Sequence, residues 1–319
     1  MRKSIRSAAA MISAALCSCT FTSGSESSAA SSEDADFLYS IINGKATITG
    51  FTGEPVFLDI PETVEDVPVT ELRDNAFFNC TSLKHISLPS SVKKIGNHTF
   101  FDCSSLESIS LPDGLEEIGM GAFSGCTNLS SIDIPDSLAS LPESCFRYCS
   151  SLSEVIIPEG ISEIGSFCFN GCGSLSYVSI IGELSRIDVG AFYGCTALRE
   201  MYIPPSVSEI GYEAIGYITG KSGAAVSSNF TLLGEENSSA EKYASENGMN
   251  FSPITISSAN KSSASGIPDY LVPMLFSLGG AAFLVACFIA LRTRFPDVFR
   301  LRRKKEKSFD FPVDKNQKI

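Results

Sequence analysis

The sequence predicts a β-rich solenoid, a fold in which short repeated windings of the chain stack in one direction. Three apolar columns recur every 23 residues, and this period carries the prediction. A phenylalanine column is followed three residues later by a cysteine column, and three residues after that by a leucine column. The members are Phe77, Phe100, Phe123, Phe146, Phe169, Phe192; Cys80, Cys103, Cys126, Cys149, Cys172, Cys195; and Leu83, Leu106, Leu129, Leu152, Leu175, Leu198.

One repeat is too small to fold alone. It offers about seven apolar side chains, worth about 2 kcal/mol each when buried. Ordering one repeat costs about 35 kcal/mol, at about 1.5 kcal/mol per residue. Stacked repeats can fold, because each column continues through its neighbours and the L-x-x-I-x-I strands can pair in parallel. We expect a parallel sheet on one face of a solenoid over residues 56–220.

Caps are expected at both ends of the stack. Residues 37–55 form the N-terminal cap, since alternating β-formers surround Asn43-Gly44, a strong two-residue hairpin signal. The first coil has five extra residues. Residues 221–252 form the C-terminal cap, with a strand over 230–234. A helix should follow it, beginning with a capping box of Ser238 and Glu241 and ending near Gly248.

Four cysteines have a spacing close to that of a four-thiolate zinc site. Cys145, Cys149, Cys168 and Cys172 form C-x3-C-x18-C-x3-C. The repeat accounts for this spacing, because Cys149 and Cys172 are members of the cysteine column. Cys145 and Cys168 occupy a position held by alanine in other repeats. Parallel Cβ vectors fit a disulfide poorly. We therefore expect no metal site and mostly free, buried thiols that pack as small apolar groups.

The repeat unit IGMGAFSGCTNLSSIDIP at 118–135 resembles the BspA-like, surface-antigen type of leucine-rich repeat. The resemblance covers residues 56–220, or 37–252 with the caps. It implies a leucine-rich-repeat solenoid with an N-terminal hairpin cap and a C-terminal strand and helix cap. It also implies adhesion, since similar proteins are associated with attachment to matrix proteins or to other cells.

The N-terminal end is expected to direct export. Residues 1–19 begin with basic side chains followed by a short apolar stretch, the pattern of an export signal. The sequence L-C-S-C at 16–19 loosely resembles a lipoprotein cleavage box with Cys19 as the lipidated residue, although a cysteine in its second position is atypical. Residues 20–36 are rich in serine and predict a flexible spacer.

The C-terminal end predicts a single membrane anchor. Residues 253–269 have the composition of a polar stalk, and residues 270–291 form a 22-residue stretch without a charge, long enough for a transmembrane helix. Residues 292–319 carry 10 Lys and Arg against 4 Asp and Glu, which predicts a basic cytoplasmic tail. The expected location is the plasma membrane, crossed once, with residues 37–252 at the cell surface.

Charge and motifs exclude several classes of function. Residues 37–291 carry 11 Lys and Arg against 28 Asp and Glu, a net charge of −17, which disfavours nucleic acid as a partner. The two histidines, His85 and His98, lie in adjacent repeats without a nucleophile motif or a phosphate-binding loop. We expect no enzyme activity, no catalytic residue and no cofactor.

A candidate binding patch is expected on the strands of the later repeats. Within L-x-x-I-x-I the variable residues should point outward, and exposed aromatic and arginine side chains are typical interface anchors. The bland alternative is that strands favour Tyr and Ile in any case. The candidate ligand-binding residues are Glu154, Ile156, Tyr177, Arg199, Glu200 and Tyr202.

The sequence as a whole predicts a membrane-anchored surface protein that binds or adheres to other molecules. Its partner would be an extracellular protein or glycan with basic patches, given the acidic body. The alternative is a structural or receptor-like surface protein that acts through lateral association and its cytoplasmic tail. Ala282, Ala286 and Ala290 form a row of small residues that could support such self-association in the membrane.

Overall fold

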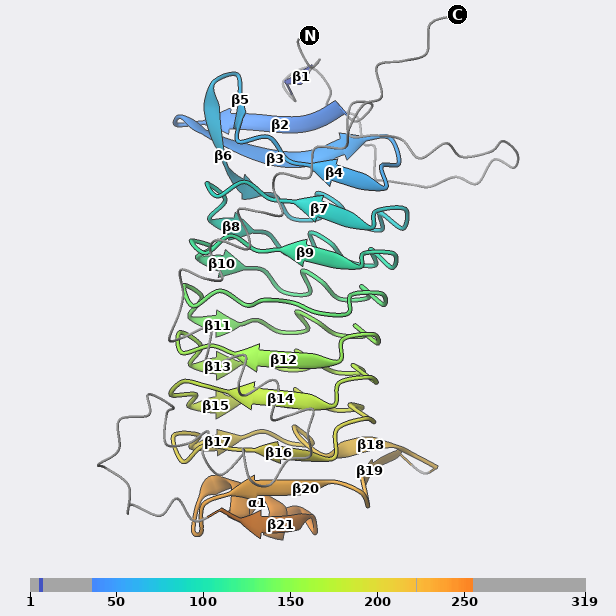
Figure 1. Cartoon of the computed structure of the whole chain (residues 1–319), viewed down its shortest axis with the longest axis vertical. Helices are drawn as coiled ribbons and strands as arrows, with labels where there is room; N and C mark the ends of the chain where they lie inside the picture. Colours follow the sequence, from blue (N-terminus) through green and yellow to red (C-terminus); the bar gives the residue numbers. More distant parts are fainter. Residues whose placement is uncertain (1–5, 8–35, 222, 255–319) are drawn as a thin grey trace, which may run out of the picture. The chain divides into compact units, whose positions relative to one another are not determined.

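A computed structural model describes residues 6–7, 36–221 and 223–254 of the chain. Over the described repeats the chain forms a solenoid whose coils stack one upon the next (Figure 1). Residues 8–35 and 255–319 lie outside the described part, and with them most of the predicted signal, the spacer, the stalk, the 270–291 segment and the tail. Within the described residues no helix is long and apolar enough to span a membrane.

Two rows of short strands run along the coils. The first row, here called the Leu–Ile face, comprises β4 (Phe57–Asp59), β7 (His85–Ser87), β9 (Ser108–Ser110), β12 (Glu154–Ile157), β14 (Tyr177–Ile180), β16 (Glu200–Tyr202), β20 (Thr231–Gly234) and β21 (Asn250–Pro253). The second row, the Ile–Gly face, comprises β6 (Val67–Leu72), β8 (Lys94–Ile95), β10 (Glu117–Ile118), β11 (Ser140–Leu141), β13 (Glu163–Ile164), β15 (Arg186–Ile187) and β17 (Glu209–Ile210).

The second row differs from the expectation of a sheet on one face only. Its strands pair in parallel with the predicted offset of one repeat, as between Ile95 and Ile118. Close approach of the coils makes this pairing possible. The Gly119 amide donates to the Ile95 carbonyl at 2.8 Å, and a Cβ on Gly119 would lie 2.4 Å from the Asn97 nitrogen. The glycine of each Ile-Gly pair therefore has a packing reason that the sequence pattern alone did not give.

The Leu–Ile face is also less continuous than expected. Residues 131–134 (SIDI) form no strand, so β9 and β12 are not joined in one sheet. The backbone still bridges the coils there, since the Ser153 amide donates to the Ser130 carbonyl at 3.3 Å. The face is interrupted again between β14 and β16, which belong to different sheets. The expected register holds in the parallel pair β12 and β14, where Glu154 lies opposite Tyr177.

Both caps contain the predicted elements. In the N-terminal cap, β2 (Asp36–Ile42) and β3 (Lys45–Thr52) pair antiparallel, and Asn43 and Gly44 between them both have positive φ, as a two-residue hairpin requires. β1 (Arg6–Ser7) pairs with β2. The extra residues of the first coil form a second hairpin, in which β5 (Thr63–Val64) pairs with β6.

The C-terminal cap contains β20, a helix and β21. The helix α1 (Ser239–Asn247) begins at the N-cap Ser238 and ends at Gly248, which has a left-handed conformation. The Ser238 hydroxyl accepts from the Glu241 amide, while the Glu241 carboxylate accepts from the amide of Asn237 rather than from that of the N-cap. A hairpin of β18 (Tyr217–Gly220) and β19 (Gly223–Val226) precedes it. The repeat pattern did not predict this hairpin.

The core is built from the predicted columns. The six rings from Phe77 to Phe192 stack on one another, with centroids 5.2–5.4 Å apart, and all six are almost wholly buried. Beside them, the thiol of Cys149 donates to the carbonyl of Phe123 in the preceding coil at 3.2 Å, and Cys103, Cys126, Cys172 and Cys195 make the equivalent bond. Cysteine is therefore both a filler and a weak donor that joins the coils.

Candidate binding surfaces

The six predicted binding residues lie on three neighbouring strands of the Leu–Ile face. Glu154 and Ile156 are on β12, Tyr177 is on β14, and Glu200 and Tyr202 are on β16, with Arg199 just before it. Glu154 and Arg199 are exposed, whereas Ile156, Tyr177 and Glu200 are half-buried. The repeat brings Glu154, Tyr177 and Glu200 into equivalent positions of successive coils, and this part of the patch has the arrangement we expected.

Tyr202 does not have the exposure that the alternation predicted. Its side chain is only 7% exposed, and Ser179, one coil earlier in the equivalent position, is 1% exposed. On the other side Tyr202 lies in register with Leu233 of β20 in the C-terminal cap. Burial raises the pKa of the Tyr202 phenol. The prediction that Tyr202 is an exposed anchor is therefore wrong.

The acidic groups around Tyr177 differ from those nearer the N-terminus in their partners. Within the described residues, Glu154 and Glu200 form no ion pair, and Arg199 donates to the carbonyl of Thr196 rather than to a carboxylate. Burial and then the nearby Glu154 carboxylate raise the pKa of Tyr177. This stretch of the face therefore presents a neutral phenol flanked by carboxylates that no cation of the described chain neutralises.

The N-terminal stretch of the Leu–Ile face is internally paired. Lys84 lies 3.0 Å from Glu107 and lowers the pKa of that carboxyl group. His85 stacks on Phe57 with ring centroids 5.1 Å apart, and its Nδ1 lies 2.9 Å from the Ser108 hydroxyl. His85 and Glu107 are 3.7 Å apart, but Lys84 is the nearer partner of the carboxylate. We assign His85 and Glu107 a structural role.

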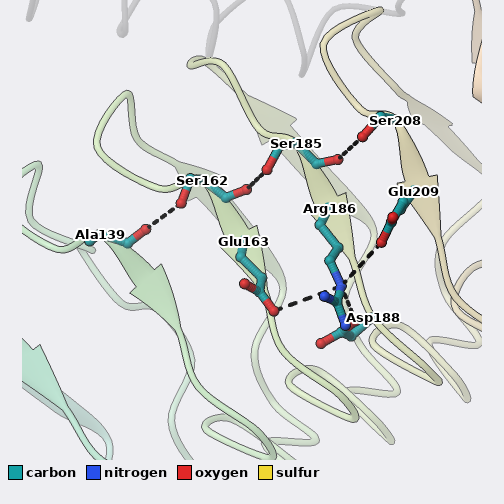
Figure 2. A network of polar contacts seen from close by, with 8 residues as sticks. All are labelled: Ala139, Ser162, Glu163, Ser185, Arg186, Asp188, Ser208 and Glu209. Carbon is teal, nitrogen blue, oxygen red and sulfur yellow. Dashed lines mark hydrogen bonds and ion pairs between the residues drawn. The ribbon is translucent and has the colours of Figure 1, made fainter.

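The Ile–Gly face carries a ladder of alternating charge. Equivalent positions of successive coils hold Glu71, Lys94, Glu117, Ser140, Glu163, Arg186 and Glu209, and neighbours in this series pair in register except Glu117 and Ser140, which lie in different sheets. Lys94 lies 3.1 Å from Glu117. Figure 2 shows the second half, where Arg186 Nε is 2.6 Å from Asp188, 3.6 Å from Glu209 and 3.9 Å from Glu163. These carboxylates raise the pKa of Arg186, Asp188 most of all.

A serine ladder runs beside the charges. The Ser162 hydroxyl donates to the Ala139 carbonyl, Ser185 to Ser162, and Ser208 to Ser185, at 2.8–3.2 Å (Figure 2). Each side chain thus satisfies a backbone acceptor one coil earlier. The polar groups of the Ile–Gly face are used within the fold, so this face offers little unsatisfied chemistry to a ligand.

A third surface, the turn edge, consists of the turns between the Ile–Gly face and the cysteine column. Its members are residues 73–79, 96–102, 119–125, 142–148, 165–171, 188–194 and 211–217. Five of the eight large apolar side chains that the described residues expose lie on it. They are Phe78, Met120, Tyr148, Val189 and Tyr212. Exposed apolar side chains gathered on one surface are typical of interaction sites, and the repeat pattern alone did not predict this edge.

One hollow lies where the Ile–Gly face meets the C-terminal cap. It has a volume of about 390 Å³ and is lined by Arg186, Asp188 and Glu209 of the coils and by Ser239, Lys242 and Glu246 of α1, among others. Its charges pair with one another, since Arg186 contacts Asp188 and Lys242 lies 3.9 Å from Glu246. We therefore assign no ligand to this hollow.

The cysteines of the zinc-like spacing all lie in the core. Cys145, Cys149, Cys168 and Cys172 are fully buried free thiols. Burial raises the pKa of each thiol, that of Cys172 to about 12. A zinc ligand is a thiolate, so this environment favours the wrong protonation state. Among the described residues no cluster of His, Cys, Asp or Glu has the arrangement of a metal site.

Comparison with known proteins agrees with this architecture. The BspA type leucine-rich repeat region matches residues 70–199, 126–239 and 162–261, in six copies. A *T. pallidum* leucine-rich repeat protein is 35% identical, with a TM-score of 0.52, over 55% of this chain and 83% of that one. A comparison with curated proteins gives no match.

Two further structures show the same fold. A leucine-rich cell surface protein from *Faecalibacterium prausnitzii* A2-165 is 24% identical over 66% of this chain and 71% of its own, with a TM-score of 0.52. A leucine-rich repeat protein from *Bacteroides ovatus* is 25% identical over 67% of this chain and 65% of its own, with a TM-score of 0.53. The chain belongs to the BspA-type leucine-rich repeat family, since the family's repeat region matches more than half of it.

Proposed function

We propose that this protein is a membrane-anchored adhesion protein whose Leu–Ile face binds a basic patch on a protein partner. One observation carries the proposal: Tyr177 lies between Glu154 and Glu200 in successive coils, and neither carboxylate has an ion-pair partner in the described part of the chain. A Lys or Arg of a partner would neutralise both carboxylates while its stem packs on the phenol ring.

The rigid scaffold favours this role. Backbone pairing fixes the strands that hold the patch, β12 with β14 and β16 with β20 of the cap, and the phenylalanine column is stacked in the same coils. Little conformational entropy is lost when such a surface binds, so more of the contact energy contributes to affinity. Ile156 and Arg199 complete the patch, and the half-buried Ile156 supplies an apolar contact beside Glu154. Tyr202 is buried beside the C-terminal cap, so it would not be a main contact of the partner.

The experiment begins with the full-length chain probed against a protein array that includes basic and acidic proteins. The hits should be enriched in basic proteins. The double variant Glu154→Gln/Glu200→Gln should weaken them about tenfold, the amount expected for two exposed charge contacts. Glu159→Gln/Glu183→Gln is the matched control, because it removes the same charge from exposed positions off the face. Equal losses in the two double variants would refute a specific patch.

Anchoring is tested separately. The chain truncated after residue 269 lacks the apolar 270–291 segment and the tail. We expect it to leave the membrane fraction, whereas a chain lacking only residues 292–319 should stay there and keep its adhesion. Retention of the first truncation in the membrane would contradict the anchor. If the chain that lacks only residues 292–319 adheres normally but no longer triggers a response inside the cell, the receptor-like alternative is favoured.

A further inference from the structure

Arg147, on the turn edge, is an arginine without an ion pair in the described chain. On the Ile–Gly face, by contrast, Lys94 and Arg186 contact carboxylates. Arg147 instead lies between two aromatic side chains. Its Cζ is 4.7 Å from the ring centroid of Tyr148 and 5.9 Å from that of Phe167, in the next coil. Its Nη2 donates to the Tyr148 hydroxyl at 3.1 Å, and its Nε is covered but has no hydrogen-bond partner.

The two aromatic residues occupy backbone positions that do not favour them. Each turn of the edge has two residues with positive φ, and five of the six equivalents of Tyr148 are Asn79, Asp102, Gly125, Gly171 and Gly194, all with positive φ. In the last turn the equivalent is Tyr217, and there the positive φ belongs to Gly216 instead. Tyr148 has a φ of 59° and Phe167 a φ of 56°. A bulky side chain in this conformation is a genuine outlier that costs about 1–3 kcal/mol. Folding alone would favour Asn or Gly at both positions.

Packing explains how the rings are tolerated, but not why they are present. The Tyr148 ring covers Gly171 and the Phe167 ring covers Gly190, each in the following coil, where a Cβ would lie about 2.4–2.5 Å from a ring carbon. Gly171 and Gly194 stack without any ring between them, so a small residue fits the same place. Tyr148 is 50% exposed, which leaves much of its side chain in contact with solvent.

We propose that Arg147, Tyr148 and Phe167 form a binding site for a carboxylate that stands beside an aromatic or apolar group, as in an acidic segment of a protein partner. The guanidinium is held in place by two rings, and a planar fork of N–H donors is well suited to a carboxylate. Tyr148 offers a ring surface next to it. This site is distinct from the acidic patch around Tyr177 and does not rest on the function proposed for that patch.

The test uses N-acetylphenylalanine, a carboxylate beside a phenyl ring, titrated into the full-length chain and followed by saturation-transfer NMR. We expect saturable binding, and no binding of N-acetylphenylalaninamide, which lacks the charge. Arg147→Gln should weaken binding about tenfold or more. Arg147→Lys keeps the charge but lacks the planar fork of donors. Its affinity for N-acetylphenylalanine should therefore lie between those of the unaltered chain and of Arg147→Gln. Arg186→Gln is the control, because Arg186 already contacts three carboxylates, and it should bind like the unaltered chain.

Tyr148→Asn separates binding from folding. Asn79 stands at the equivalent position of another repeat and has a φ of 58°, so the backbone of this turn accommodates asparagine. This variant should stay folded and lose most of its binding. The proposal is overturned if the acid and the amide bind equally, if Arg147→Gln binds like the unaltered chain, or if glucuronate binds while N-acetylphenylalanine does not. The last result would assign the site to an acidic glycan instead.

Discussion

Two arginines of this solenoid have opposite surroundings. Arg186, on the Ile–Gly face, contacts Glu163, Asp188 and Glu209 within one alternating ladder. Arg147, on the turn edge, contacts two aromatic rings and has no carboxylate partner within the described residues. The first charge is used to hold neighbouring coils in register, and the second is available to a partner.

A repeated scaffold of this kind can give different tasks to different surfaces. The columns beneath both arginines are the same, with stacked phenylalanines and cysteine thiols bonded to the preceding coil. Within the described residues, the strand charges of the Ile–Gly face from Lys94 to Glu209 form ion pairs, whereas Arg147, Glu154 and Glu200 form none. The candidate binding groups are therefore charged side chains that the fold does not pair, and not the residues of the repeat pattern.

The strongest predicted effect on stability concerns the interior, which supports both surfaces. Burial raises the pKa of the cysteine thiols, that of Cys172 from 9.0 to about 12. A raised pKa means that the thiol's contribution to stability is complete below pH 9 and is lost as the pH rises toward 12. For Cys172 alone the loss is on the order of 4 kcal/mol by pH 12, and about half of that by pH 10.5. Urea unfolding at pH 7, 9 and 10.5 should show this fall, and the other buried thiols add to it.

Alkylation provides the control for that prediction. Iodoacetamide at pH 8 should leave the peptides with Cys103 to Cys195 unlabelled in the folded chain and label them all in urea, as peptide mass mapping would show. Rapid labelling of Cys149 or Cys172 in the folded chain would contradict their burial. About one zinc ion bound per chain through these thiols would contradict it too.

The second prediction concerns the packing of the Tyr148 ring on the turn edge. Gly171→Ala places a Cβ 2.4 Å from the Tyr148 ring, at a φ of 76°. We expect a loss of about 3 kcal/mol, from left-handed strain and overpacking. Gly173→Ala is the matched control, since its Cβ would lie 3.7 Å from the Thr196 hydroxyl and its φ is not positive. Thermal unfolding measures both, and equal losses would mean that Tyr148 does not lie over Gly171.

A smaller effect has the opposite sign. Tyr148→Asn relieves the strain of a bulky residue at positive φ but removes the ring that covers Gly171. We expect stability to stay constant or rise by up to about 1 kcal/mol. Chemical denaturation of this variant beside the unaltered chain gives the answer. A clear fall in stability would show that the ring is needed by the fold, and the case for a binding role would weaken.

The sequence predicted the interior well because one period fixes it. A 23-residue repeat of Phe, Cys and Leu can be buried in only one way when the coils stack, and the hairpin at Asn43-Gly44 and the helix after Ser238 have local signals of their own. The surfaces were harder to predict. Tyr202 was expected to be exposed by alternation, but its burial depends on its place beside the C-terminal cap, which no local pattern encodes.

The turn edge was missed for a similar reason. Arg147 and Phe167 are 20 residues apart, and they meet because the coils stack and because two left-handed residues turn the chain in every repeat. A signal was present in the sequence, since Tyr148 stands where all the other repeats except the last, which has Tyr217, have Gly, Asn or Asp. Reading it requires knowing that this position has a positive φ, and that is a property of the folded coil.

The most direct test of the contrast between the two arginines is the free energy of unfolding of Arg186→Gln and Arg147→Gln, measured in parallel by urea denaturation at low ionic strength. Arg186→Gln leaves three carboxylates facing one another and should be measurably destabilised, though only modestly because these groups are partly solvated. Arg147→Gln should lose nothing measurable. If Arg147→Gln is the more destabilised of the two, the fold uses that charge for its own stability, and the division of roles between the Ile–Gly face and the turn edge is wrong.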